Sequence, residues 1–126
     1  MAQGPYIVTG ASKGIGRAIA QEIAKHGYPV IALARASKEL EQIATELSLL
    51  HPKSMALACD LSNPKDIASA ATQIYNLFPW IAGLVHNAGT IEPVQPLNQV
   101  SISLWSESIQ VNLIGVQDLT QQLMKH

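Results

Sequence analysis

The chain has 126 residues, of which 48% are hydrophobic and 13% are charged, and its formal net charge is −1. This composition is typical of one globular domain with a substantial apolar core, and it excludes a disordered chain. The near-zero charge gives no sign of a nucleic-acid partner or of an anionic membrane surface as partner.

Apolar runs of strand length alternate with segments of helical period along the whole chain. Short apolar strands joined by helical segments are typical of parallel strands covered on both faces. The predicted strands are residues 5–9, 29–34, 54–59 and 81–86; the predicted helices are residues 14–26, 38–50, 64–78 and a long one from Ser101 or Ser103 almost to the C-terminus.

Local signals mark the helices more closely. In the first helix, Ile15, Ile19 and Ile23 recur at helical spacing and predict a buried stripe. Ser37 is a good N-cap for the second helix, and Asn63 is a good N-cap for the third, where a proline follows in the first helical position.

This order of elements predicts an α/β fold. We expect a Rossmann-type doubly wound parallel sheet with strand order 3-2-1-4 and helices on both faces. The long last helix is apolar on more than one side. Such a helix must be covered on several faces, and four strands cannot supply all of that cover. Its apolar residues are Leu104, Trp105, Ile109, Val111, Leu113, Ile114, Val116, Leu119 and Leu123.

The single cysteine and the ends of the predicted elements bear on localisation. One cysteine, Cys59, excludes an internal disulfide and agrees with a reducing compartment, and its apolar neighbours predict a buried structural thiol. No apolar stretch is long enough to span a bilayer, and a first strand that begins by Tyr6 leaves no room for a signal peptide. We therefore expect a cytoplasmic protein without a membrane partner.

A glycine-rich segment, residues 9–16, links the first strand to the first helix. Its glycines, Gly10, Gly14 and Gly16, allow a tight turn and let a pyrophosphate approach the backbone. Free N–H groups and the helix dipole favour an anion there. No Gly-Lys pair exists, which argues against an ATP-binding loop of the Walker type. The segment predicts nucleotide binding.

Four motifs together resemble the short-chain dehydrogenase/reductase family, and their order and spacing agree over the whole chain. The segment 89–94 also resembles carbonyl reductases of the sepiapterin and benzil reductase type. The four motifs are Thr-Gly-x-x-x-Gly-x-Gly at residues 9–16, Asp60-Leu61 after the third strand, His86-Asn87-Ala88-Gly89 after the fourth, and Val111-Asn112-Leu113 in the long helix. The family often has an asparagine where His86 stands, and we assign this histidine a structural role.

The resemblance implies a bound nicotinamide dinucleotide. It implies that the glycine-rich segment holds the pyrophosphate and adenosine ribose, and that Asp60 bonds the adenine amino group with Leu61 as an apolar neighbour. It implies that the loop after the fourth strand passes the ribose near the nicotinamide, with Asn87 also bracing the sheet. The implied cofactor-binding residues are Gly10, Ser12, Lys13, Gly14, Ile15, Gly16, Arg35, Asp60, Leu61, Asn87, Ala88, Gly89 and Val111.

One catalytic residue is also implied. Asn112 matches the helix asparagine of the family's catalytic tetrad, where it distorts the helix and holds a proton-relay water. Plainer alternatives stay open for the motifs. Asp60 can be a cap that ends a strand, residues 87–89 can be only a turn, and Asn112 can be a satisfied polar residue in a helix interface.

The end of the second strand favours NADP over NAD. Enzymes that bind NAD hold the ribose hydroxyls with a carboxylate that closes this strand. Here Arg35 stands there instead, and Glu39 falls inside the next helix. Arg35 offers a planar cation for a 2′-phosphate, Lys13 can reach the same place and Ser12 can donate a hydroxyl. The alternative is that both cations are solvated surface residues.

The tyrosine and lysine of the family's chemistry are missing from these residues. The family delivers a proton from a tyrosine whose pKa is lowered by a lysine four positions later, and Tyr6, Tyr28 and Tyr75 lack that lysine. We therefore interpret residues 1–126 as an incomplete NADP-binding domain without the catalytic half. It would serve an NADP(H)-dependent oxidoreductase that acts on a small carbonyl or alcohol substrate, and it would be inactive alone.

Two further expectations concern partners. The resemblance implies that the long last helix packs against its copy in a neighbouring subunit, so we expect a homo-oligomer. We expect no metal ion and no nucleic acid. The alternative to an enzyme is a non-catalytic dinucleotide-binding module or sensor.

Overall fold

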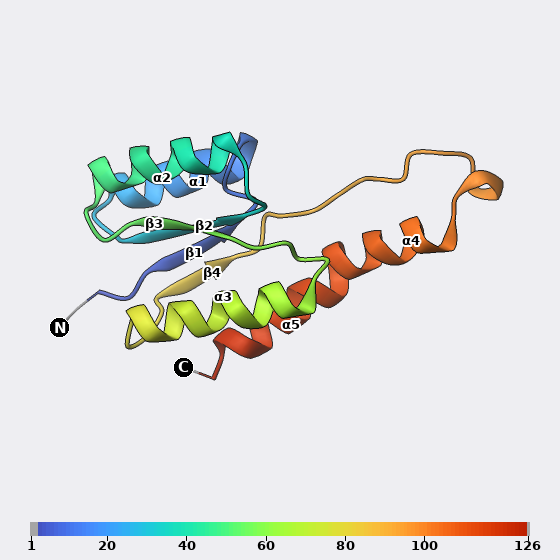
Figure 1. The fold of residues 1–126 in the computed structure, drawn as a ribbon. Coiled ribbons are helices and arrows are strands. Elements are labelled where there is room, and N and C mark those ends of the chain that lie inside the picture. The colour runs from blue at the N-terminus through green and yellow to red at the C-terminus, as the bar shows by residue number, and fades with distance from the viewer. Residues whose placement is uncertain (1–2, 126) are drawn as a thin grey trace.

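The computed structural model describes residues 3–125. Its four parallel strands form one sheet in the predicted order, β3-β2-β1-β4 (Figure 1). In the register of this sheet, Ile7 of β1 lies opposite Ile31 of β2 and Leu84 of β4. The predicted sheet of the Rossmann type is confirmed. The strands are β1 (Tyr6–Thr9), β2 (Val30–Ala34), β3 (Met55–Ala58) and β4 (Gly83–Val85).

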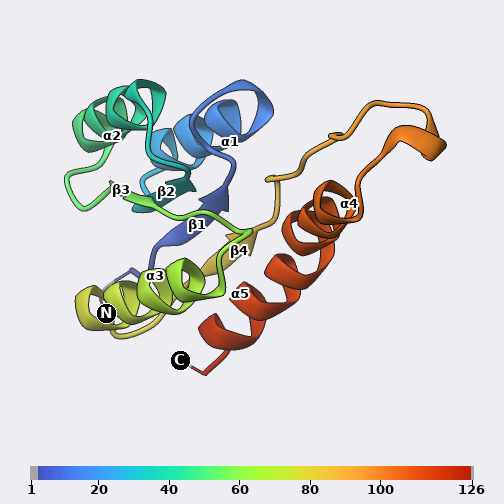
Figure 2. The same ribbon diagram turned by 45° about the vertical axis from the view of Figure 1, so that its right-hand side comes forward.

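Helices cover both faces of the sheet, as predicted. The helices α1 (Gly14–Lys25) and α2 (Lys38–Leu50) lie on one face, and α3 (Pro64–Leu77) and α5 (Gly115–Leu123) lie on the other (Figures 1 and 2). Each face has its own core cluster, and the neighbours Ile7 and Val8 of β1 belong to opposite clusters. This alternation follows from the two-residue period of a strand.

The predicted helix caps form. The Ser37 hydroxyl accepts a hydrogen bond from the Leu40 amide at 3.1 Å, and the Asn63 side chain accepts one from the Lys65 amide at 3.0 Å. Ser101 caps a later helix in the same way, with its hydroxyl 3.2 Å from an amide nitrogen three residues on. These bonds satisfy N–H groups that have no partner inside a helix.

The predicted buried stripe of α1 is wrong at Ile15, which is 75% exposed. The first turn of α1 packs so closely on the loops after β1 and β4 that a Cβ on Gly16 would overlap the carbonyl oxygen of Gly10. The helix therefore turns its smallest side chains to the sheet, while Ile19 and Ile23 pack at the margin of that core cluster. The residues that α1 buries are Gly16, Ala20 and Ala24.

The predicted long last helix is interrupted. After the 3₁₀ turn η1 (Leu97–Gln99), α4 (Ile102–Ile109) continues into a π-helical turn, η2 (Gln110–Ile114), and then into α5. Among the described residues, α4 buries no side chain, and it extends beyond the sheet (Figures 1 and 2). No helix within residues 3–125 has the length and apolar character needed to cross a membrane.

Exposure of apolar side chains on this segment agrees with prediction in part. Trp105, Ile109 and Leu113 are 50%, 39% and 64% exposed, as expected for a helix that lacks cover. Val116 is partly buried instead, because it lies in α5, which packs against α3. The uncovered apolar surface is therefore concentrated on α4 and η2.

Candidate functional site

A cleft of about 760 Å³ lies at the carboxyl ends of the strands, and residues that follow all four strands line it. Ligands of open parallel sheets bind at this edge. The cleft brings together most of the predicted site. The predicted residues that line it are Gly10, Ser12, Lys13, Arg35, Asp60, Leu61, Asn87, Ala88, Gly89 and Val111. The predicted residues outside its lining are Gly14, Ile15, Gly16 and Asn112.

The glycine-rich turn requires glycine for two different reasons. Gly10 and Gly14 have φ values of +63° and +60°, which L-residues with a Cβ rarely adopt. Gly16 has no such φ, but a Cβ there would overlap Gly10 and the side chain of Asn87. The turn thus leads from Gly10 to Lys13, the N-cap of α1, and both residues line the cleft, so the free N–H groups at the start of α1 favour an anion near it.

Thr9 joins the loops after β1 and β4, and the motif analysis did not single it out. Its hydroxyl oxygen accepts hydrogen bonds from the amides of Asn87 and Ala88, both at 3.0 Å. The Asn87 side chain donates to the carbonyl of Gly10 at 3.1 Å. Asn87 therefore links the loop after β4 to the turn after β1, whereas the resemblance implies that it braces the sheet.

Two cations line the cleft. Lys13 precedes α1 and Arg35 follows β2, and both side chains are exposed and line the cleft. Glu39, in the first turn of α2, also lines the cleft, although its place within a helix predicted no part in the site. Asp60 also lines the cleft and interacts with the charge of Arg35, so the two cations lie among acidic side chains.

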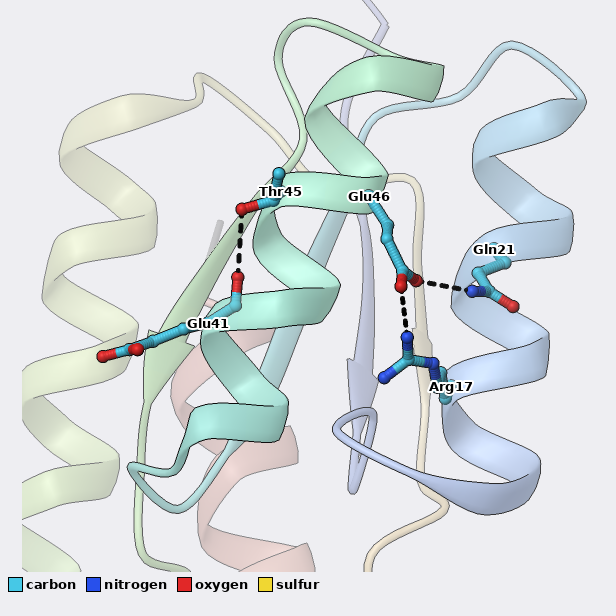
Figure 3. A network of polar contacts seen from close by, with 5 residues as sticks. All are labelled: Arg17, Gln21, Glu41, Thr45 and Glu46. Carbon is cyan, nitrogen blue, oxygen red and sulfur yellow. Dashed lines mark hydrogen bonds and ion pairs between the residues drawn. The ribbon is translucent and has the colours of Figure 1, made fainter.

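Arg17 lies close by in the sequence but belongs to a different contact. Figure 3 shows its guanidinium turned toward α2, where it pairs with Glu46. Gln21 donates to the other oxygen of the same carboxylate at 2.7 Å. This network joins α1 to α2, and Arg17 is not among the residues that line the cleft.

Asp60 organises the turn after β3 while it faces the cleft. Its Oδ1 accepts hydrogen bonds from the Ser62 hydroxyl at 2.7 Å and from the Ser62 amide at 2.9 Å. These bonds, with a smaller contribution from the charge of Arg35, hold the pKa of Asp60 below its ordinary value. The carboxylate is therefore ionised at neutral pH and acts as an acceptor. Asp60 can therefore cap the end of β3, as the plainer alternative holds, and also take part in the cleft.

Cys59 is buried, as predicted, with 3% of its surface exposed. Burial, together with the negative charges of Asp66 and Asp60, raises the pKa of its thiol to about 12. At pH 8, only about one molecule in ten thousand then carries the reactive thiolate.

We expect iodoacetamide to leave Cys59 unmodified in the folded protein and to alkylate it rapidly in urea. Mass spectrometry follows the alkylation. Rapid alkylation in both conditions would contradict the structural role.

Asn112 lies in the π-helical turn and holds the loop after β4. Its Oδ1 accepts a hydrogen bond from the Thr90 amide at 2.8 Å, and its Nδ2 donates to the Thr90 carbonyl at 2.7 Å. The helix is distorted at this residue, as the resemblance implies. The side chain is also satisfied, as the plainer alternative holds. The relay water stays a prediction.

His86 connects the end of β4 to α5. Its Nε2 lies 2.7 Å from the hydroxyl of Thr120, which donates its own proton to the carbonyl of Val116 at 2.7 Å. The histidine must therefore donate from Nε2. Burial lowers the pKa of His86, which favours the neutral ring. These contacts agree with the structural role assigned to it.

One face of α4 and the start of η2 also line the cleft, and of their residues sequence reasoning identified only Val111. Leu104, Glu107, Ser108 and Val111 follow the spacing of one helical face, and all four belong to the lining. The spacing alone could have grouped them. Which face meets the cleft depends on residues 90–100, whose path the sequence did not predict.

A sequence model of the family described as short chain dehydrogenase matches residues 6–126. The chain belongs to the short-chain dehydrogenase family. Among curated relatives, it is 35% identical over 118 residues to dehydrogenase/reductase SDR family member 11 of Gallus gallus. That match covers 92% of this chain and 46% of the relative.

Two solved structures have the same fold. A short chain dehydrogenase from Shigella flexneri 2a, complexed with NADP, superposes with a TM-score of 0.86 at 30% identity, over 99% of this chain and 54% of that one. One from Escherichia coli CFT073, complexed with NADPH, gives 0.86 at 31% identity, over 99% and 53%. The chain therefore spans about half the length of these relatives.

Proposed function

We propose that the cleft binds NADP(H) and that the chain supplies the cofactor-binding half of an oxidoreductase. The reaction is hydride transfer between the nicotinamide and a small carbonyl or alcohol substrate. The observation that carries the proposal is that Lys13, from the glycine-rich turn, and Arg35, after β2, line the same cleft. The two relatives complexed with NADP and NADPH support it.

The residues of the cleft fit this cofactor. The turn at Gly10 and the N-terminus of α1 would hold the pyrophosphate, because N–H groups and the helix dipole meet there. Lys13 and Arg35 would hold the 2′-phosphate by charge-assisted hydrogen bonds, helped by the Ser12 hydroxyl. Asp60 would accept from the adenine amino group. When bound, the nicotinamide supplies or takes the hydride.

The remaining predicted residues line the rest of the same cleft. Leu61 and Val111 would be the apolar neighbours of the adenine ring, and the loop of Asn87, Ala88 and Gly89 would pass beside the ribose near the nicotinamide. Gly14, Ile15 and Gly16, outside the lining, would act through the turn that they form. Asn112 would act through its two hydrogen bonds to Thr90, which hold the loop after β4.

A fluorescence titration of the purified protein tests the binding step. We expect NADPH to bind saturably and NADH to bind more weakly, because only NADPH carries the phosphate that Lys13 and Arg35 face. Absence of saturable binding for both dinucleotides would overturn the proposal.

We expect the 126-residue chain to bind the cofactor without turnover. None of its tyrosines is followed four residues later by a lysine, and an isolated phenol with a pKa of about 10 is a poor proton donor near pH 7. The measurement is NADPH oxidation, followed by absorbance, with a generic diketone. Oxidation above the buffer rate would contradict this prediction.

A second candidate function is a dinucleotide-binding module without chemistry. The missing tyrosine–lysine pair in these residues favours it. The complete coding sequence separates the candidates. A Tyr-x-x-x-Lys pair beyond residue 126, together with diketone reduction by the longer protein, supports the enzyme. A binding module would bind NADPH and reduce nothing.

We also propose that the chain self-associates through α4 and η2. Trp105, Ile109 and Leu113 expose apolar surface there, and large apolar patches drive association. We expect light scattering to give a mass above that of the monomer. Trp105→Glu should lower this mass, and Leu49→Glu, on the exposed surface of α2, should not. A monomeric parent protein would refute the proposal.

A further inference from the structure

The π-helical turn is fitted closely against the loop after β3. A Cβ on Gly115, the first residue of α5, would lie 2.5 Å from the carbonyl oxygen of Leu61 and 2.9 Å from that of Gln110. Cβ atoms essentially never approach a backbone oxygen so closely. The Gln110 side chain donates a hydrogen bond to the same Leu61 oxygen at 3.3 Å. The first residue of η2 and the residue directly after η2 thus converge on one carbonyl.

The same turn also holds the loop after β4. Asn112 binds both the amide and the carbonyl of Thr90, at 2.8 and 2.7 Å. A Cβ on Gly89 would lie 3.3 Å from the Asn112 oxygen, so this loop also approaches the turn closely. β3 and β4 are the two outer strands of the sheet. A turn of five residues therefore connects the loops of opposite edges, and both loops line the cleft.

We propose that Gly115 and Gln110 are positioning residues that set the distance between the π-helical turn and the Leu61 carbonyl. Through Asn112 they fix the Thr90 loop relative to the Leu61 loop. They thereby set the spacing of two walls of the cleft. The inference rests on the proposed function for its consequence in cofactor binding, whereas the mechanical link between the loops stands independently of it.

The Leu61 side of this contact is the firmer one. Leu61 is 6% exposed and belongs to the core cluster. Its neighbour Asp60 donates its amide to the Asp66 carboxylate at 3.1 Å and accepts the Asn63 amide at 2.9 Å. In the π-helical turn, by contrast, Asn112 and the two apolar residues after it are exposed. A larger side chain at position 115 would therefore displace the turn and carry Asn112 and Thr90 with it.

Gly115→Ala tests the link in the protein as it stands. Alanine is the better helix former, so a helical glycine without a close neighbour should tolerate it. Here we expect NADPH affinity to fall about tenfold, the effect of overpacking a tight contact. We also expect the Thr90 amide resonance to shift in the NMR spectrum, because its bond to Asn112 changes. The Lys13 amide, in the turn after β1, serves as the unmoved reference.

Gln110→Leu removes the donor to Leu61 without adding a clash, and it decides the question if Gly115→Ala does not fold. We expect the same shift at Thr90 and a smaller, about threefold, loss of NADPH affinity. Gln121→Leu, an exposed position on α5, is the matched control and should change neither.

The outcomes separate the two proposals. An unmoved Thr90 amide in both variants, or NADPH affinity equal to that of the parent protein, would overturn the positioning role. A shift at Thr90 in a protein whose parent form binds no NADPH would instead overturn the proposed function and leave the link between the loops in place.

Discussion

Replacing Arg35 with aspartate should weaken NADPH binding by about 2 kcal/mol more than NADH binding. The substitution removes charge-assisted hydrogen bonds to the 2′-phosphate and places a negative charge beside it. NADH lacks that phosphate and should lose little. Calorimetric titration of both dinucleotides gives the difference directly.

Lys53→Asp is the control for Arg35→Asp. It makes the same change of charge, but Lys53 precedes β3 and so lies at the amino ends of the strands, away from the cleft. We expect both affinities to stay close to those of the parent protein, because an exposed charge at that distance is screened by salt. Equal losses for NADPH and NADH in Arg35→Asp would remove this residue from the site.

Thr9→Val should lower the free energy of unfolding by about 2–4 kcal/mol, because two amides lose their shared acceptor. Thr9 is 1% exposed, and its hydroxyl oxygen accepts from the amides of Asn87 and Ala88. Valine has nearly the same shape, so packing changes little, and the loss reports the two unsatisfied N–H groups together with the long bond, 3.4 Å, that the hydroxyl donates to the Val85 carbonyl. Urea unfolding followed by circular dichroism measures it.

Thr72→Val provides the comparison for Thr9→Val. Thr72 is exposed on α3, and its hydroxyl donates only to the Ala68 carbonyl of its own helix, at 3.0 Å. We expect a change within about 0.5 kcal/mol, as for most surface substitutions. Similar values for the two variants would mean that the Thr9 hydroxyl does not hold the loop after β4.

Most of the fold was predictable from the sequence because apolar residues follow two patterns along it, the short runs of strands and the helical period. Strand-length apolar runs and capped helices alternate, and the handedness of parallel connections then leaves few strand orders. The stripe of α1 could not be predicted from hydrophobicity, because the close approach at Gly16 turns small residues to the sheet and leaves Ile15 exposed. Steric contact overrode apolar periodicity there.

The break in the last helix was only partly predictable. Its apolar pattern is continuous, and the resemblance implied a distortion at Asn112 without its extent. The π-helical turn depends on contacts that are distant in sequence: Thr90 with Asn112, and the Leu61 carbonyl with Gly115. Residue types alone do not reveal such contacts.

The candidate site was predictable where it follows strand ends. The carboxyl ends of parallel strands share one edge, so motifs after β1, β2, β3 and β4 had to converge. The role of Thr9 was missed because a buried threonine at a strand end has no pattern that separates it from a core residue. The part that α4 plays in lining the cleft was missed because the loop before α4 determines which face of this helix meets the cleft.

Amide chemical-shift mapping with NADPH tests the central claim most directly. We predict that the perturbed amides cluster in the turn of Gly10 to Lys13, at Arg35, at Asp60 and Leu61, and in the loop after β4. We predict no comparable change on the outer surfaces of α1 and α3. Absence of perturbation on saturating addition of NADPH, or a cluster away from the carboxyl ends of the strands, would contradict the account.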